Sequence, residues 1–392
     1  RSRLTQPQGP QHLLLRSVSG ADMDPPQASL DLSIADKEER KAYLDAIDVV
    51  MQHGRFINGP EIVELESAIA AFCKRKFAVG VGSGTDAIFL ALKALGIVAG
   101  DHIITSSISW LASATTIAQT GATPVFADVN EDLNINLDSV RENLNHQTKA
   151  ILAVDYAGKI CQIEELRTIA EAQGMPLIED ASQAFGAFRN GAPAGANSDI
   201  AVFSLNPMKV LPAMGEAGII LTDDEALTER LKSLRYHGMI DRWRTATLSP
   251  NARMDTIQAA ILLKRLEQVE HVISARTAIA EQYNRGLSSY VTIPQQTNSP
   301  ETRDAWFVYP IQTTERDKLI KHLHKLGIEA LLREHIALPD QPVFASYNSA
   351  TTKNARRIAD QLLCLPLHEN LTEDDVNFVL EGVQSFFDGD AS

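Results

Sequence analysis

Two ionisable residues, Asp180 and Lys209, each stand at or just past the end of a short apolar run. Asp180 ends the run that starts at Leu177, and Lys209 lies five residues after Ser204, where a second run ends. Short apolar runs bounded by turn residues are typical of buried strands. Since α/β folds place their chemistry at strand ends, we expect both side chains to belong to a reactive site.

Lys209 is flanked by apolar residues, among them Met208, Val210 and Leu211. Loss of hydration in such a setting favours the neutral amine. A neutral amine can form a Schiff base with a carbonyl, including that of pyridoxal phosphate. That cofactor needs an acid against its ring nitrogen to keep the ring an electron sink, and Asp180 is the candidate. The alternative is a lysine on an exposed loop, where most lysines lie.

A candidate anion site lies earlier in the chain, at residues 82–85, which read Gly-Ser-Gly-Thr. A strand predicted over Phe77–Val81 enters this turn, and a helix predicted over Asp86–Leu95 leaves it. The first N–H groups of a helix lack partners and its dipole adds positive potential, so the turn could hold a phosphate, with hydroxyls from Ser83 and Thr85. The spacing fits neither a Walker loop nor a dinucleotide fingerprint. An ordinary tight turn with a helix cap is the alternative.

Trp110 follows the predicted strand His102–Ser106. An indole just past a strand end could stack on a flat ring. A position in the hydrophobic core is the alternative that the sequence leaves open.

Composition and charge narrow the classes of function. Of 392 residues, 44% are hydrophobic and 22% are charged, which is typical of a globular protein. The net charge of −14 argues against a general affinity for nucleic acid or anionic membranes. Cys73, Cys161 and Cys364 form no CxxC pair and no metal-ligand cluster, so we expect no metal and a reducing, cytoplasmic location. No apolar run is long enough to span a bilayer.

The order of the segments predicts an α/β fold with two domains. Strands alternate with helices from Phe77 to Thr222, which indicates a mostly parallel sheet covered on both faces. We expect residues 1–27 to be a disordered or vector-derived tail, since Met23 is a candidate natural start. Residues 28–285 would form the large domain with an N-terminal helical segment, and residues 286–392 a smaller α+β domain. One long amphipathic helix is expected to follow Asp255, with Ile257 to Val272 in helical phase.

Eight motifs in register make the chain from about Ala28 to Phe387 resemble the DegT/DnrJ/EryC1/StrS family of sugar aminotransferases. They are Asn58-Gly59-Pro60, Gly82-Ser83-Gly84-Thr85, Ile178 to Gly186, Phe203-Ser204 through Lys209, Gly215 to Gly218, Arg235 to Gly238, Asn251 to Asp255 with Gln258-Ala259-Ala260, and Pro366-Leu367-His368. The resemblance implies the fold type I architecture of pyridoxal-phosphate transferases: a large domain with a mostly parallel sheet and a smaller C-terminal α+β domain.

The resemblance also implies a role for each matching residue. Lys209 would form the internal aldimine with pyridoxal phosphate and then move protons, and Asp180 would pair with the ring nitrogen. The other implied cofactor-binding residues are Gln183 at the ring hydroxyl, Trp110 on the ring face, Gly84, Thr85 and Ser204 at the phosphate, and Asn251 reaching that phosphate from a neighbouring subunit. The active unit would then be a homodimer with two shared sites.

The implied reaction is a ping-pong transamination. Glutamate or glutamine would give its nitrogen to the cofactor, and the nitrogen would then pass to a keto-sugar or aldehydo-sugar, usually nucleotide-linked. Such a reaction serves amino-sugar biosynthesis for a surface polysaccharide or a secondary metabolite. An oxidised sugar acid and a keto-cyclitol are alternative acceptors.

The sequence departs from the family pattern near the expected acceptor pocket. Asp155 stands where many relatives carry His, Lys159 follows shortly after, and residues 332–336 lack the usual His-Tyr-Pro. Lys159, Arg333 and His335 could suit an acidic acceptor such as a keto-sugar acid. Solvated surface charge is the alternative for all three.

Three other functions can be compared with transamination: a dehydratase, a cofactor-binding sensor and a lyase. Relatives that act as dehydratases replace the lysine with His, and Lys209 argues against that class here. Nothing in the sequence favours a cofactor-binding sensor without turnover, because the acid, the lysine and the phosphate-binding groups are all present. A lyase of the same fold is a wider alternative, and the stretch around Lys209 fits the sugar family better. Detectable transfer of nitrogen from glutamate would separate an enzyme from a sensor.

Overall fold

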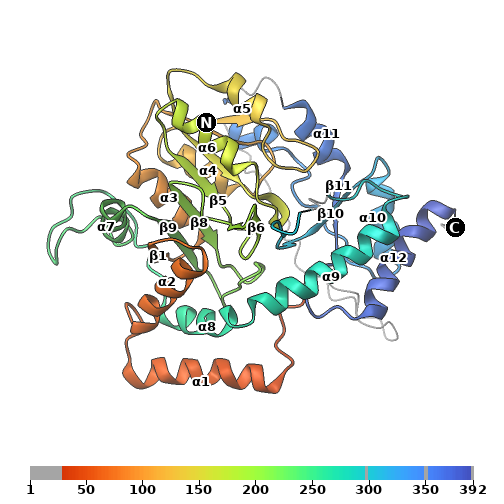
Figure 1. Ribbon diagram of the computed structural model, residues 1–392, viewed down its shortest axis with the longest axis horizontal. Coiled ribbons are helices and arrows are strands. Elements are labelled where there is room, and N and C mark those ends of the chain that lie inside the picture. Colours follow the sequence, from red (N-terminus) through yellow and green to blue (C-terminus); the bar gives the residue numbers. More distant parts are fainter. Residues whose placement is uncertain (1–28, 296–298, 348–351, 390–392) are drawn as a thin grey trace, which may run out of the picture.

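A seven-stranded sheet forms the centre of the computed structural model, which describes residues 29–295, 299–347 and 352–389 (Figure 1). Its strands, in spatial order, are β1 (Phe77–Val81), β9 (Gly218–Thr222), β8 (Ile200–Ser204), β5 (Leu177–Asp180), β4 (Thr148–Val154), β2 (His102–Ser106) and β3 (Thr123–Ala127). Only β9 runs antiparallel to its neighbours, and the other pairs are parallel. The predicted mostly parallel sheet is confirmed.

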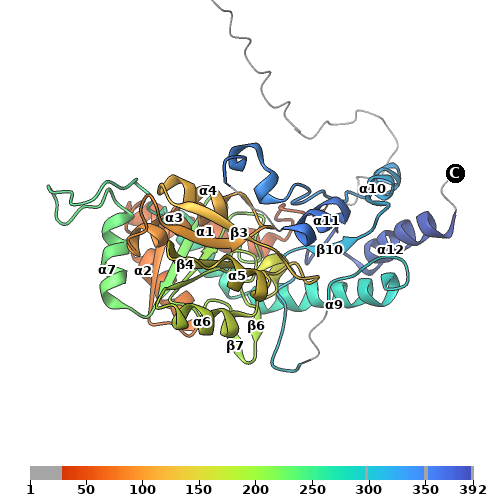
Figure 2. The ribbon, with the colours of Figure 1, turned by 90° about the horizontal axis from the view of Figure 1, so that it is seen from above.

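Helices cover both faces of this sheet, which explains why its strands read as nearly unbroken apolar runs. One face packs against α3 (Gly84–Ala94), α4 (Ala112–Gln119) and α7 (Glu225–Leu234). The other packs against α2 (Pro60–Phe72), α5 (Leu137–Asn143), α6 (Ile163–Ala172) and α8 (Thr256–Leu266). In Figure 2, α4 and α6 lie on opposite sides of the strands. Residues that alternate along a strand therefore face different helices.

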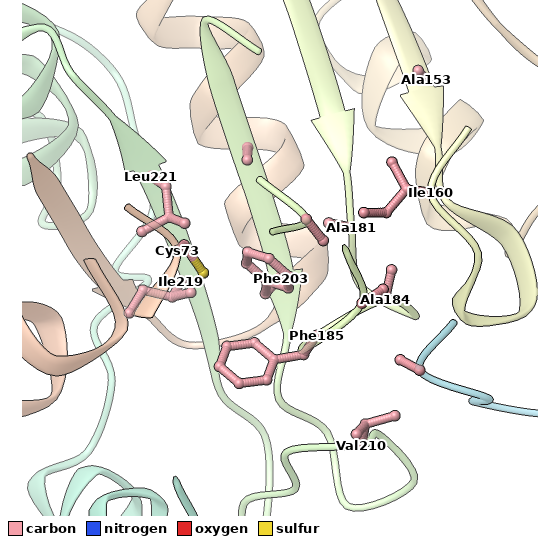
Figure 3. Close-up of a cluster of buried hydrophobic side chains, with 14 of the residues drawn as sticks. Cys73, Ala153, Ile160, Ala181, Ala184, Phe185, Phe203, Val210, Ile219 and Leu221 are labelled. Atoms are coloured by element: carbon pink, nitrogen blue, oxygen red, sulfur yellow. The ribbon is translucent and has the colours of Figure 1, made fainter. Parts of the chain in front are cut away.

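The core on the α2 side reaches the loop that carries Lys209. Figure 3 shows Phe185 and Phe203 in this core, and their ring centroids lie 5.2 Å apart in an edge-to-face arrangement. Val210, the residue after Lys209, is buried in the same cluster. Because Val210 is buried, it fixes the position of this loop. The backbone of Lys209 is therefore positioned by the packing of its neighbour.

Helix α1 (Lys37–His53) runs along the edge of the molecule and contacts α8 (Figure 1). Asp36 caps its start, and Gly54 ends it in the left-handed conformation with a φ of 69°. Of its apolar side chains, Tyr43 and Val50 are buried, whereas Leu44 and Met51 are exposed. The apolar face of α1 is therefore only partly covered by this chain.

The expected single helix after Asp255 is two helices, α8 and α9 (Val269–Leu287), which is a correction. Glu267 stays near helical values, whereas Gln268, with a φ of −102° and a ψ of −5°, departs from them and separates the two helices. The apolar phase runs across the bend without interruption, and no Gly or Pro marks it. Periodicity alone could not detect it.

A second core is built by the C-terminal part of the chain together with α9. Helix α9 gives Val269 and Ile273 to the first core, and Ile279 and Tyr283 to the second (Figure 1). The other elements here are β10 (Tyr309–Gln312), α10 (Arg316–Lys325), α11 (Lys353–Gln361), β11 (Leu362–Leu365) and α12 (Glu373–Asp388). The helix thus crosses the division expected at residue 285, which stays a prediction.

Short elements complete the described chain. The Gly/Ala-rich loop after Asp180 contains a small hairpin of β6 (Phe188–Arg189) and β7 (Ala192–Pro193). Three 3-10 turns cover Tyr156–Gly158, Leu338–Asp340 and Pro342–Phe344. No helix among the described residues has the length and apolar character to cross a membrane. The tail expected at residues 1–27 lies outside the described residues.

Candidate active site

A cavity of about 540 Å³ opens at the carboxyl ends of the parallel strands. Asp180 ends β5 and Ser204 ends β8, and parallel neighbours end at the same edge of a sheet. Nine of the residues singled out from the sequence line this one cavity: Gly84, Thr85, Trp110, Asp180, Gln183, Ser204, Lys209, Arg333 and His335. Segments as far apart in sequence as α3 and residues 333–335 therefore meet here.

Asp180 is buried, and its carboxylate is oriented by two donors. The Ser113 hydroxyl donates to Oδ2 at 3.0 Å, and the backbone N–H of Ser182 donates to Oδ1 at 3.2 Å. Ser109 in turn lies 2.8 Å from Ser113, hydroxyl to hydroxyl. The two donors fix the orientation of the Asp180 carboxylate, which lines the cavity.

Gln183 has its side-chain amide fixed by the backbone. The N–H of Ala157 donates to Oε1 of Gln183 at 2.8 Å. A backbone N–H can only donate, so the carbonyl end of the amide must face it. The NH₂ end is left as a donor at the cavity wall, where Gln183 is one of the lining residues.

The N-terminus of α3 approaches the end of β8 more closely than a side chain would allow. A Cβ added to Gly84 would lie 2.5 Å from Cβ of Ser204. Ser83 caps the helix by accepting from the N–H of Asp86 at 3.0 Å. Among the described residues no acceptor bonds the N–H groups of Gly84 and Thr85. The helix end therefore presents two free donors and the dipole to the cavity.

Lys209 is partly buried and lines the same cavity. Its Nζ lies 4.3 Å from the centroid of the Phe307 ring. Burial lowers the pKa of the Lys209 amine to about 8; the charge of Asp180 opposes this shift, and that of Arg333 adds to it. A lowered pKa gives the amine a neutral fraction at physiological pH, which nucleophilic and general-base chemistry both require.

Arg333 and His335 approach the cavity from the C-terminal part of the chain. The guanidinium carbon of Arg333 lies 5.0 Å from the Phe307 ring centroid. No carboxylate of the described residues forms an ion pair with Arg333, and its Nε is buried without a bond. Glu334 lies between Arg333 and His335 in the sequence and accepts a short hydrogen bond from the Tyr156 hydroxyl. This bond connects the segment to the 3-10 turn after β4.

Two residues singled out from the sequence lie outside this cavity. Lys159 borders a separate small hollow, where its amine donates to the carbonyl of Gln295 at 2.8 Å and lies 3.9 Å from Asp132. Its charge also faces the buried Asp304. Lys159 thus lies outside the cavity, with its amine engaged by groups of its own chain, and its expected part in binding an acidic acceptor stays a prediction. Asn251 is exposed, and accepts a hydrogen bond from Arg253.

Sequence reasoning missed Phe307 and Ser113. Phe307 sits in an apolar run that was assigned to the smaller domain, and nothing local indicates that it meets Lys209. Ser113 lies in the first turn of α4 and Ser109 in the bend before it, and no local signal indicates that their hydroxyls meet next to Asp180.

The chain matches a known protein family over most of its length. Residues 37–384 match the DegT/DnrJ/EryC1/StrS aminotransferase family. The chain belongs to this family. The match spans the sheet, the cavity and the C-terminal part, so the resemblance seen in the motifs is confirmed.

Curated relatives align along nearly their whole length. A dTDP-3-amino-3,4,6-trideoxy-alpha-D-glucose transaminase from Streptomyces venezuelae is 35% identical, over 91% of this chain and 95% of that protein. A UDP-2-acetamido-2-deoxy-3-oxo-D-glucuronate aminotransferase from Pseudomonas aeruginosa is 31% identical, over 88% of this chain and 96% of that protein. Among solved structures, S. venezuelae DesV in complex with a ketimine intermediate superposes with a TM-score of 0.89 at 34% identity, covering 93% of this chain and 99% of that chain.

This family uses pyridoxal phosphate, and the cavity fits that cofactor. A phosphate suits the two free N–H groups at the α3 N-terminus, where glycine at position 84 lets the helix end approach Ser204 closely. The oriented Asp180 suits a protonated ring nitrogen, and a lysine of lowered pKa suits the aldehyde. The prediction of a pyridoxal-phosphate-dependent sugar aminotransferase is confirmed at the level of the family.

Proposed function

We propose that this chain moves an amino group from glutamate or glutamine to the carbonyl of a nucleotide-linked keto-sugar. The observation on which this rests is that Asp180, Lys209 and the N-terminus of α3 line one cavity. The relatives' acceptors, a dTDP-linked and a UDP-linked sugar, support the nucleotide-linked class. The product would serve amino-sugar biosynthesis.

Each residue of the cavity has a proposed part in holding the cofactor. The Asp180 carboxylate binds the ring N–H, and the Gln183 NH₂ donates to the ring hydroxyl. The N–H groups of Gly84 and Thr85 and the hydroxyl of Ser204 bind the phosphate. The exposed face of Trp110, with 62% of the residue accessible, offers a surface on which the ring stacks.

Lys209 supplies both the attachment point and the proton transfer. Bound pyridoxal phosphate withdraws electrons from the bond that breaks at the donor's α-carbon. The Lys209 amine, with its pKa near 8, removes the proton from that carbon as a neutral base. The charge of Asp180 opposes further lowering of this pKa, so the amine stays basic enough to take the proton.

Arg333 is the proposed anchor for an anionic group of the substrates. A guanidinium that no carboxylate of the described chain pairs is suited to a carboxylate or a phosphate in the cavity. His335 lies beside it as a second donor. A sugar acid stays the alternative acceptor, because Arg333 would pair with its carboxylate and one relative acts on an oxidised glucuronate sugar.

The active form is proposed to be a homodimer in which each site takes Asn251 from the partner chain. Asn251 is exposed and lies outside its own chain's cavity, so it is free to serve another. The segment before it carries Trp243 and Leu248, which are 82% and 89% exposed. Apolar residues this open in a protruding loop, together with the uncovered face of α1, suit burial against a second copy.

A cytoplasmic location is proposed from the cysteines. Cys73, Cys161 and Cys364 are all buried free thiols. Buried unpaired cysteines are typical of reducing compartments.

An absorbance experiment separates the proposed enzyme from a cofactor-binding sensor. The purified protein loaded with pyridoxal phosphate should show a visible band that fades when glutamate or glutamine is added. A dTDP- or UDP-linked keto-sugar should then restore the band, and a keto-sugar acid tested alongside decides the alternative. A band that survives both donors would contradict the aminotransferase proposal and favour a sensor. The control is Lys209→Ala, in which no such band should form.

A further inference from the structure

Two acidic side chains meet on the face of the sheet opposite to Asp180. Glu179 precedes Asp180 on β5, so its side chain projects to the other face, and Asp155 follows β4, the neighbouring strand. Both are fully enclosed, with 0% of Asp155 and 1% of Glu179 exposed. Their carboxyl groups lie within hydrogen-bonding reach of each other.

The remaining contacts of the pair leave one oxygen on each side without a donor. Oδ1 of Asp155 accepts from the N–H of Cys161 at 3.0 Å, and Oε1 of Glu179 accepts from the N–H of Gly195 at 2.7 Å. Among the described residues no hydrogen bond reaches Oδ2 of Asp155 or Oε2 of Glu179, and the Ser198 hydroxyl lies near Glu179. Two ionised carboxylates side by side in a dry core are strongly unfavourable. A single proton shared between the two carboxyl groups removes this repulsion.

The proton belongs on Asp155. Cys73 and Arg75 lie near Glu179, and Cys161 lies near Asp155, with Arg189 acting on Cys161. Burial raises the pKa of Glu179, and the Gly195 N–H and the charge of Arg75 oppose this rise. Burial, and then the Glu179 charge, raise the pKa of Asp155 well above its usual range. Asp155 is thus the neutral acid that donates to Glu179.

The loop that begins at Asp155 contacts two residues of the cavity, Gln183 and Phe307. Its bond to Cys161 brackets residues 155–161, and within this loop the N–H of Ala157 holds Gln183 while the carbonyl of Ala157 accepts from the N–H of Phe307 at 3.1 Å. Ala157 has a φ of 59°, a left-handed conformation that is strained for a non-glycine residue. Outside bonds must therefore hold the peptide in place.

We propose that Asp155, as a protonated acid shared with Glu179, is a positioning residue that sets the Ala157 peptide and through it Gln183 and Phe307. The inference rests on the proposed function for its link to the cofactor ring, but not for the protonated pair itself. Asp155 touches neither substrate nor cofactor.

The protonated pair is tested first, on cofactor-free protein. Infrared spectra at about pH 8 should show the carbonyl stretch of a neutral carboxylic acid in the wild type, and this band should be missing from Asp155→Asn. Asp304→Asn is the matched control, because burial raises the pKa of Asp304 only to about 6, so that its carboxyl is ionised at that pH. A wild-type spectrum without a difference from Asp155→Asn would overturn the proposal.

The pH dependence of the free energy of unfolding is an independent test of the protonated pair. A carboxyl with a raised folded-state pKa stabilises the protein below its unfolded pKa of about 4, and this contribution is lost as the pH rises toward the folded pKa. The stability of Asp155→Asn by urea unfolding should therefore rise relative to the wild type above about pH 4. A difference that does not change with pH would contradict a shared proton.

Rescue by the conservative variant tests the positioning role. Asparagine keeps a donor toward Glu179 and an acceptor for Cys161, whereas Asp155→Ala removes both. We expect Asp155→Ala to shift the visible band of the loaded protein and slow the glutamate half-reaction by on the order of 100-fold, with Asp155→Asn recovering most of it. Equal loss in both variants would sink the positioning role. If the wild type itself fails to react with either donor while the infrared band is present, the proposed function fails and the protonated pair stands.

Discussion

The side-chain nitrogen of Lys209 and the ring of Phe307 are 4.3 Å apart, measured to the ring centroid, and the guanidinium of Arg333 lies 5.0 Å from the same ring. One aromatic side chain thus contacts both cations of the cavity. A ring face attracts a cation, so Phe307 can hold the amine in place without neutralising it. The pKa of Lys209 is lowered mainly by burial, and the charges of Asp180 and Arg333 shift it in opposite directions.

Removing the amine should abolish the donor half-reaction while leaving the fold intact. Lys209→Ala loses the group that takes the proton from the donor, and a positioned base contributes about 100-fold or more. Rapid mixing of the loaded protein with glutamate measures the rate. Lys325→Ala, at the exposed end of α10, is the matched control and should react like the wild type. A Lys209→Ala variant with wild-type rates would remove the lysine from the mechanism.

Substitutions of the two charged neighbours should move the pKa of Lys209 in opposite directions. Arg333 lowers this pKa and Asp180 raises it, so Arg333→Gln should shift it upward from about 8 and Asp180→Asn downward. The amine would then need a higher pH to become neutral in Arg333→Gln and a lower one in Asp180→Asn. Methyl groups labelled with carbon-13 and placed on the lysines allow titration by NMR, with Lys209→Ala identifying the signal. Shifts of the same sign in both variants would contradict the charge assignment.

A methyl group at position 84 should weaken the phosphate site. The Cβ of Gly84→Ala would lie 2.5 Å from Cβ of Ser204, so α3 must move away from β8. We expect the dissociation constant of pyridoxal phosphate to rise by at least about 10-fold. Equilibrium dialysis measures it, with Gly54→Asn as the control, since that left-handed cap has open space around it. Undiminished affinity would place the phosphate elsewhere.

Mixed dimers test whether Asn251 serves the partner's site. Asn251→Ala alone should weaken cofactor binding by about 10-fold to 100-fold, the worth of one hydrogen bond to a charged group. Refolding equal amounts of Lys209→Ala and Asn251→Ala chains gives dimers of which about half are mixed, each with one intact site. About a quarter of the wild-type sites should return. Activity no higher than the average of the two parent variants would contradict shared sites.

Local sequence determined the strands and the glycine turn, and it singled out Asp180 and Lys209 as the pair proposed to react. Apolar runs such as Leu177–Asp180 and Ile200–Ser204 are buried on both faces, so their pattern survives in the one-dimensional sequence. The turn at residues 82–85 was predictable for a similar reason, because glycine and a capping serine act within a few residues of themselves.

Only the tertiary structure decided which side chains meet across the cavity and behind it. Lys159 and Arg333 looked alike in the sequence, yet the first is engaged by Gln295 and Asp132 while the second opens into the cavity. Phe307 under Lys209, and Asp155 against Glu179, bring together residues from different segments of the chain. Such contacts depend on how separate elements pack, and no local pattern encodes a partner more than a turn or a strand away.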